Sequence, residues 1–423
     1  MDNGDYNARP QVSNYRWWIC VLLFFGTTIC YLDRQVIGLL KPTLEKDLKI
    51  TEIQFGHIIF WFQAAYAAGY LLAGRLNDIL RVRRGYALAV FVWSLAAMAH
   101  GLVRTVAGFS VARIVLGLSE GGNFPAAIRS VSEWFPRKER ALATGIFNAG
   151  SNVGVMVSAL LVPWITLNYG WSVAFWVTGA VGFIWLIPWL LFYGQPETHP
   201  SVSKAELEWI QADPADLPEK ISWVSLLKHR STWAFAVGAL LTSPIWWFYL
   251  YWVPDFLFKT QHFDLKNIGW PLVTVYLIAD FGSVGGGWLS STLIHRGWSV
   301  NAARKTALLT CALCVVPVLL ATQVSSPWFA TVVIGLAAAA HQGWSANLYT
   351  LVSDTTPRKA VSSVVGMGGM AGAIAGMFFA ELVGHVLEWT HSYVILFAIA
   401  PCAYLLAFGL IQLLVPKIEP RQA

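Results

Sequence analysis

Four ionisable residues lie inside stretches of this chain that are otherwise apolar. Asp33 and Arg34 are neighbours in the segment ICYLDRQVIGLL, and Arg113 and Glu120 lie two helical turns apart in another apolar stretch. A charge at the depth of a bilayer costs several kcal/mol, so such residues commonly mark a binding site or a path for ions. Guanidinium groups bind carboxylates through paired hydrogen bonds, and a buried carboxyl group can take up a proton. The four residues therefore predict binding of an organic anion together with proton movement.

Helical geometry separates the roles of the adjacent pair. Neighbouring side chains on a helix diverge by about 100°, so Asp33 and Arg34 must meet different partners. We expect Arg34 to bind a substrate carboxylate and Asp33 to face Arg113 and Glu120. Asp33 and Glu120 are then the candidate proton carriers, with Arg113 setting their pKa values. The alternative is a static charge network that only holds helices together.

Polar and aromatic side chains also recur on single faces of other apolar stretches. Amides and hydroxyls there can hydrogen-bond a polar ligand, and aromatic rings four residues apart can stack on a flat face of it. For each residue alone, helix packing is the alternative interpretation. The candidates for substrate contact are Asn148, Ser151, Asn152, Trp247, Tyr251, His341, Gln342 and Asn347.

The composition identifies the environment of these residues. Of 423 residues, 56% are hydrophobic and only 12% are charged, whereas a soluble domain carries about 25% charged residues. The apolar runs are long and do not alternate, which predicts spanning helices in a lipid bilayer and not a barrel. No basic cluster with interleaved aromatic residues suggests nucleic-acid binding. Nor does a metal-ligand, nucleotide-binding or nucleophile motif appear, so we expect no cofactor, no metal and no enzymatic activity.

The apolar runs give the number of helices. A spanning helix needs about 20 apolar residues, and a polar stretch at 195–230 divides the candidate spans into six and six. The predicted spans are 17–40, 56–77, 86–106, 108–131, 141–164, 171–193, 232–257, 268–293, 305–323, 328–352, 361–384 and 391–415. The predicted domains are an N-terminal segment (1–16), a six-helix bundle (17–193), a linker (194–231), a second six-helix bundle (232–415) and a tail (416–423).

The loops predict the orientation and an internal repeat. Most loop Lys and Arg residues fall on the side that carries both termini and the linker, which makes that side cytoplasmic. The segment GRLND (74–78) corresponds to GWLSS (287–291), and PRK recurs at 136–138 and 357–359. Two parallel six-helix repeats joined by a linker describe the all-α major facilitator fold with two pseudo-symmetric bundles.

The loop after the second predicted span carries a more specific signal. The residues from Gly74 through Asp78 to Arg83 and Arg84 resemble the signature of the major facilitator superfamily. The loop departs from that signature by one extra residue and by Ile79, where the signature has arginine. The resemblance implies that Asp78, Arg83 and Arg84 form a cytoplasmic gate, and we assign Arg129 near the end of the fourth span to the same gate.

Three further segments resemble one branch of that superfamily. YLDR (31–34), RIVLGLSEGGNFPA (113–126) and WFPRKER (134–140) are together similar to the anion:cation symporter family, whose members carry organic anions, many with protons. SEWFPRKER and AHQGWSANLYTLVSD are most similar to its bacterial hexuronate transporters. The acid before Arg34 is closer to the galactonate-type pattern, in which a tyrosine matching Tyr66 contacts substrate.

The resemblance implies a function for the whole chain. It implies a proton-coupled symporter of hexuronates that works by alternating access in the bacterial cytoplasmic (inner) membrane, with another organic anion such as galactonate or glucarate as the alternative substrate. The expected partners are the sugar-acid anion, the proton and the bilayer, and we expect a monomer.

Overall fold

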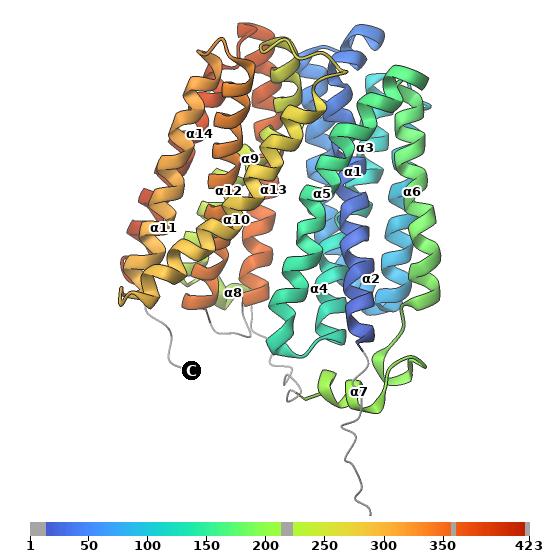
Figure 1. Cartoon of the computed structure of the whole chain (residues 1–423), viewed down its shortest axis with the longest axis vertical. Helices are drawn as coiled ribbons and strands as arrows, with labels where there is room; N and C mark the ends of the chain where they lie inside the picture. The colour runs from blue at the N-terminus through green and yellow to red at the C-terminus, as the bar shows by residue number, and fades with distance from the viewer. Residues whose placement is uncertain (1–13, 213–222, 357–360, 419–423) are drawn as a thin grey trace, which may run out of the picture.

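The computed structural model describes residues 14–212, 223–356 and 361–418, with side chains except at 73–78, 137–138, 141, 223–224, 353 and 361–363. Every regular element in these ranges is a helix, so the predicted all-helical fold is confirmed (Figure 1). The first half contains α1 (Tyr15–Leu48), α2 (Glu52–His100), α3 (Val106–Glu120), α4 (Asn123–Trp134), α5 (Arg137–Tyr169) and α6 (Trp171–Phe192). The linker contains η1 (Pro196–Thr198), α7 (Lys204–Ile210) and α8 (Trp223–Leu226). The second half contains α9 (Arg230–Lys259), α10 (Gly269–His295), α11 (Val300–Val315), η2 (Val316–Thr322), α12 (Pro327–Thr355), α13 (Val361–Thr390) and α14 (Val394–Leu414).

Eight helical segments among the described residues are long and apolar enough to span a membrane, with α11 and η2 together making one of them. The other four predicted spans lie in the two parts of α2, in α3 with α4, and in α12. In the structure α3 and α4 are only 15 and 12 residues long, and α12 carries His341 and Gln342 near its middle, which lowers its mean hydropathy. Helices that surround a polar cavity are expected to have this composition.

Two predicted boundaries differ from the structure. Spans 56–77 and 86–106 are joined in one long helix, α2, whose only non-helical residue is Arg81 with φ 62° and ψ 156°. Span 108–131 is instead divided into α3 and α4 at Gly121 and Gly122. A single residue of positive φ suffices for the sharp turn between two antiparallel helices, so the expected loop is almost absent.

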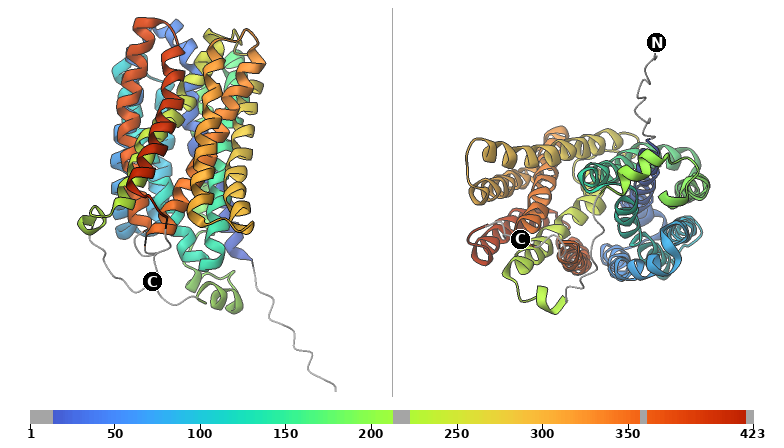
Figure 2. Two further views of the ribbon diagram at one scale, coloured as in Figure 1. Left: turned by 90° about the vertical axis from the view of Figure 1, so that its left-hand side faces the viewer. Right: turned by 90° about the horizontal axis from the view of Figure 1, so that it is seen from below.

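The helices form two bundles side by side, α1–α6 and α9–α14 (Figures 1 and 2). The start of α1, the end of α14 and the linker helix α7 lie on one face, at the bottom of Figure 1, which we call the termini face. The other end of the molecule is called the opposite face. The bundles contact each other mainly through α2 with α13, α5 with α10 and α1 with α9.

The linker helix α7 is attached to the first bundle. Glu206 accepts hydrogen bonds from the backbone N–H groups of Tyr15 (3.2 Å) and Arg16 (3.1 Å) at the start of α1. A carboxylate at this position satisfies free amide groups and interacts favourably with the helix dipole. The Arg16 guanidinium joins Glu206 (3.1 Å) to Glu139 of α5 (2.8 Å), and Trp209 donates to Glu139. Part of the linker is therefore fixed to α1 and α5.

Candidate functional site

The centre of the first bundle holds a buried ion pair. Arg34 of α1 donates to Oε2 of Glu120, the last residue of α3, from Nε (2.9 Å) and from Nη2 (2.8 Å). The side chains are 1% and 0% exposed. The two residues lie 86 positions apart in the chain, so only the packing of α1 against the α3–α4 segment brings them together.

The other two predicted charges complete the group. Asp33 lies on another side of α1, beside Thr178 of α6 and within electrostatic range of Glu120 and Arg113, and no direct ion pair joins it to either among the described residues. Arg113 donates a long hydrogen bond (3.5 Å) to the backbone carbonyl of Arg34. All four charged side chains are buried. With two arginines and two carboxylates, this four-charge network is neutral when every member is ionised. The predicted divergence of Asp33 from Arg34 is seen directly.

Glycines allow the helix that carries Glu120 to approach α2 closely. A Cβ atom added to Gly117 would lie 2.4 Å from the carbonyl oxygen of Phe62, and one added to Gly121 would lie 2.7 Å from the backbone of Tyr66 and Tyr70. Real Cβ atoms do not approach backbone atoms so closely, so both positions require glycine. This contact places Glu120, and with it the four-charge network, against α2.

Aromatic rings surround the other side of the Arg34 guanidinium. Its central carbon lies 4.6 Å from the ring centroid of Tyr31, 4.7 Å from Tyr66, 5.3 Å from Trp247 and 5.4 Å from Phe62. These distances are within the range of cation–π attraction. Tyr31, Tyr66 and Trp247 also line a cavity, so only this aromatic layer separates Arg34 from it.

The cavity has a volume of about 250 Å³ and lies between the two bundles. Its lining residues lie at the middle of the helices and in the parts nearer the termini face. Six predicted substrate-contact residues line it: Tyr66, Asn148, Ser151, Trp247, His341 and Gln342. Ser345, which shares a face of α12 with His341, also lines it, as do residues that we did not predict, including Tyr31, Tyr70, Ser243, Trp246 and Tyr349. Tyr70 follows Tyr66 by one helical turn, which was a usable signal.

The remaining predicted substrate-contact residues lie outside the cavity lining. Asn152 of α5 donates to Asp280 of α10, so it joins the two bundles. Asn347 donates to the carbonyls of Gly286 and Gly343 (2.9 Å each) and holds α12 against α10. Tyr251 is fully buried and its ring lies parallel to Trp247, with centroids 6.1 Å apart. In this conformation the three side chains support the cavity wall.

The predicted gate residues have separate surroundings at the termini face. Arg129 pairs with Glu133 in the next turn of α4 (3.2 Å), and Tyr193 donates to the same carboxylate (3.1 Å). Arg83 donates to the carbonyl of Leu190 at the end of α6. Arg84 is exposed. The side chain of Asp78 lies outside the described residues, so its predicted pairing is untested.

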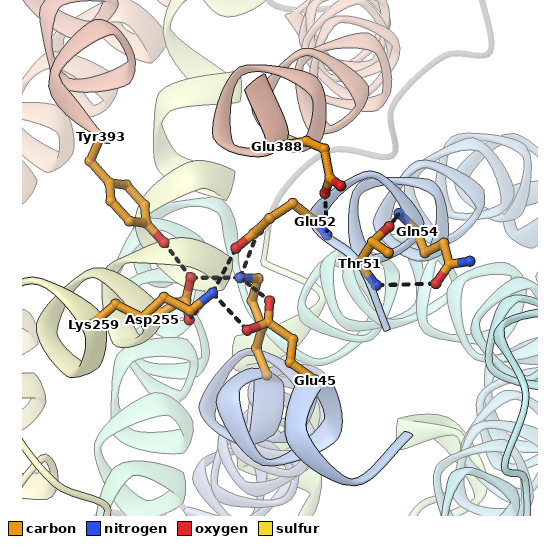
Figure 3. Close-up of polar contacts among 9 residues, drawn as sticks. Glu45, Thr51, Glu52, Gln54, Asp255, Lys259, Glu388 and Tyr393 are labelled. Atoms are coloured by element: carbon orange, nitrogen blue, oxygen red, sulfur yellow. Dashed lines mark hydrogen bonds and ion pairs between the residues drawn. The ribbon is translucent and has the colours of Figure 1, made fainter. Parts of the chain in front are cut away.

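Ion pairs join the two bundles at the opposite face (Figure 3). We call this group the opposite-face cluster: Lys41, Glu45, Glu52, Asp255 and Lys259. The fully buried Lys41 ammonium lies 2.5 Å from Asp255, 2.7 Å from Glu45 and 2.8 Å from Glu52. Lys259 lies 2.6 Å from both glutamates. The ammonium groups thus lie between the three carboxylates, and the cluster links α1 and α2 to α9.

Further contacts close the same face. Gln35 donates to the carbonyl of Leu250 (2.7 Å), and His57 lies 2.6 Å from Glu381 of α13. A Cβ on Gly56 would lie 2.7 Å from the carbonyl of Ala380, so α2 and α13 meet backbone to backbone. The bundles are therefore in direct contact beyond the cavity on the opposite face, while the cavity lies nearer the termini face.

Two bundles around a central polar cavity, with charges buried beside it and ion pairs that close one face, are the architecture of a membrane transporter. A sequence profile described as the Major Facilitator Superfamily matches residues 23–380. The chain belongs to the Major Facilitator Superfamily, and the predicted family and fold class are confirmed. It is a multi-pass membrane transporter and not an enzyme.

Individual relatives refine the comparison. The chain is 32% identical over 385 residues to a hexuronate transporter of Escherichia coli, covering 89% of each chain. It is 33% identical over 296 residues to a galacturonate transporter of Dickeya chrysanthemi, covering 69% of this chain and 86% of that one. Among solved structures, a bacterial homologue of the human lysosomal transporter Spinster, in an inward-facing and unoccupied conformation, superposes with TM-score 0.73. That pair shares 17% identity and covers 97% of this chain and 100% of the other.

Proposed function

We propose that this chain is a proton-coupled symporter of monoanionic sugar acids, with the hexuronates galacturonate and glucuronate as its substrates. The observation that carries the proposal is the neutral four-charge network buried beside a polar, aromatic-lined cavity. The hexuronate and galacturonate transporters among its relatives support the choice of substrate.

Charge balance gives the reason for coupling. Arg34 is the cation nearest to the cavity wall, and Glu120 already occupies it. A substrate carboxylate can bind Nη1 of Arg34, which has no hydrogen-bond partner among the described residues, but its charge would leave the network with one buried negative charge in excess. An uncompensated buried charge costs several kcal/mol. A proton on Glu120 removes that charge, so anion and proton bind favourably only together. Asp33 is the second candidate carrier, and Arg113 stabilises whichever carboxylate remains ionised.

The cavity wall supports recognition of a sugar acid. Asn148, Ser151 and Gln342 present amide and hydroxyl groups that can bind sugar hydroxyls. Tyr66 and Trp247 offer aromatic faces beside Arg34. For the carboxylate to reach the guanidinium, these rings must turn aside, so binding and rearrangement of the wall occur together.

The proposal also assigns the faces of the molecule. The termini face is cytoplasmic, because most loop Lys and Arg residues lie there, and the membrane is the bacterial cytoplasmic membrane. The conformation is then inward-facing, with the opposite-face cluster closing the outer side. The two bundles rock about the central site during transport, and one chain contains the complete path, so the unit is a monomer.

Transport in proteoliposomes tests this proposal. Symport of one proton with one monoanion is electroneutral, so a gradient of one pH unit, acid outside, should give about tenfold accumulation of galacturonate. Two protons per anion would give about 100-fold and would respond to membrane potential. Glu120→Gln should still exchange galacturonate across the membrane but should accumulate none above equilibrium, because it has lost the proton site.

Glu208→Gln is the matched control, since Glu208 is an exposed residue of the linker helix α7 and lies outside the network and the predicted gate. It should accumulate substrate like the wild type. Accumulation by Glu120→Gln equal to that of the wild type would contradict the coupling role, and dependence on sodium in place of the pH gradient would contradict proton coupling. Counterflow with galactonate and glucarate beside the two uronates tests the choice of sugar acid.

A further inference from the structure

His341 is the cavity residue whose ring is held most firmly. Its imidazole lies parallel to the indole of Trp246, with centroids 5.0 Å apart and an interplanar angle of 10°. Its Nδ1 atom hydrogen-bonds the hydroxyl of Tyr404, and its Nε2 atom lies 3.3 Å from the hydroxyl of Ser345. Trp246, His341 and Ser345 all line the cavity. The Nε2 side of the ring is therefore the side that adjoins the cavity.

Tyr404 contacts His341 on the side of the imidazole ring that faces away from the cavity. It lies on α14, which supplies none of the residues that line the cavity, and it is fully buried. Its ring packs edge-on against Trp344 (5.4 Å) and His341 (6.1 Å). Within the described part of the chain, its hydroxyl hydrogen-bonds Nδ1 of His341. Tyr404 can therefore act on a ligand only through His341.

The need of each buried polar group for a partner decides which residue donates the hydrogen bond between Tyr404 and His341. A buried phenol that accepted a hydrogen bond from Nδ1–H would leave its own proton without an acceptor, which is costly. The hydroxyl of Tyr404 therefore donates, and Nδ1 of His341 accepts. A neutral imidazole with Nδ1 as acceptor carries its proton on Nε2. No carboxylate pairs with His341 among the described residues, and the apolar ring stack favours the neutral form.

We propose that Tyr404 is a positioning residue that fixes His341 as an Nε2–H donor toward the cavity, and that this donor selects among sugar acids by binding one substrate hydroxyl. The inference rests on the proposed function, since it names a specificity determinant of that same cavity. With the other tautomer, Nε2 would accept from a hydroxyl instead of donating to it. The bond from Tyr404 removes this ambiguity, and the ring stack with Trp246 fixes the direction of the donor.

Competing uptake of galacturonate and glucuronate tests the proposal, because the two uronates differ only in the configuration at one hydroxyl. Loss of one oriented hydrogen bond should change the ratio of their kcat/KM values by about three- to tenfold. We expect Tyr404→Phe to bring the ratio toward one, chiefly through KM. Tyr276→Phe is the matched control: this buried tyrosine packs against the same Trp246 (6.1 Å), but its hydroxyl donates to the carbonyl of Tyr249. It should leave the ratio unchanged.

A second background separates positioning from loss of packing. His341→Phe keeps a ring against Trp246 but removes both ring nitrogens, so adding Tyr404→Phe to it should not change the ratio further. An equal change in both backgrounds, or an unchanged ratio in the single Tyr404→Phe variant, would overturn the role of Tyr404. Failure of the wild type to take up either uronate would refute the proposed function and with it this inference.

Discussion

Lys41 offers a direct test of how the opposite face is held closed. Its ammonium group is fully buried and contacts carboxylates from its own helix, from α2 and from α9. The contact with Asp255 joins residues 214 positions apart in different bundles. Opening the opposite face must separate these groups and return them to water. Lys41→Met keeps most of the side-chain volume but removes the charge, so we expect it to destabilise the closed face selectively.

The size of the effect follows from the burial of the partners. Removing one partner of a buried ion pair costs about 3–5 kcal/mol. Asp255 is fully buried, whereas the side chains of Glu45 and Glu52 are 17% and 15% exposed, and Lys259 still neutralises part of their charge. We therefore expect Lys41→Met to destabilise the closed conformation by the lower end of this range, about 3 kcal/mol. That shifts the equilibrium between the two conformations about 100-fold toward the open one. A minor state of about 1% would become about as populated as the major one.

Pulsed electron paramagnetic resonance measures this population. Asp47 at the end of α1 and Thr260 after α9 are both exposed, and spin labels on cysteines at these positions report the separation of the bundle tips. The five native cysteines are replaced first. The wild type should show mainly the short distance, and Lys41→Met should show a long distance of comparable weight. Lys46→Met removes an exposed lysine from the same helix and should resemble the wild type.

A wild-type distance distribution from folded, labelled Lys41→Met would show that the Lys41 charge does not hold the opposite face closed. A double variant sharpens the result. Lys41→Met combined with Asp255→Asn removes both charges, so the double variant should recover part of the closed population relative to Lys41→Met alone. Equal opening in the single and double variants would show that lost packing, and not charge, causes the shift.

Two further predictions concern packing around the network and the linker. Gly121→Ala should abolish uptake and lower the yield of monodisperse protein, because its Cβ would lie 2.7 Å from the backbone of α2. Gly145→Ala should be tolerated, because no atom lies within 4 Å of the added Cβ. Normal uptake by Gly121→Ala would contradict the close approach of the two helices. Glu206→Gln should destabilise the attachment of α7 by about 2 kcal/mol, since a charged acceptor of two backbone N–H groups is lost. Thermal unfolding in detergent measures this change, and an unchanged midpoint would contradict it.

Part of the site follows from helical geometry alone. The 100° between neighbours is local, so the sequence could predict that Asp33 and Arg34 meet different partners. The cost of charge in a bilayer likewise makes Arg113 and Glu120 visible in apolar runs. The prediction that Arg34 faces substrate is less complete, because in this conformation Glu120 occupies it and Tyr31, Tyr66 and Trp247 cover it. Which carboxylate an arginine meets depends on how the helices pack.

Other features had no usable signal in the sequence. Lys41 and Glu45 resemble ordinary loop charges, and their role appears only when α9 brings Asp255 beside them. Tyr404 lies in one of the most apolar helices, where an aromatic residue suggests packing, yet its hydroxyl meets His341 from behind the cavity.

By itself, the sequence determined the membrane environment, the all-helical architecture of two bundles and the residues that carry buried charge, because hydrophobic length and the cost of burying charge act along the chain. Only the tertiary structure decided which charges pair, which residues line the cavity and which face is closed. Those properties depend on contacts between helices far apart in sequence, and the same helices can pack in more than one way as the two bundles move.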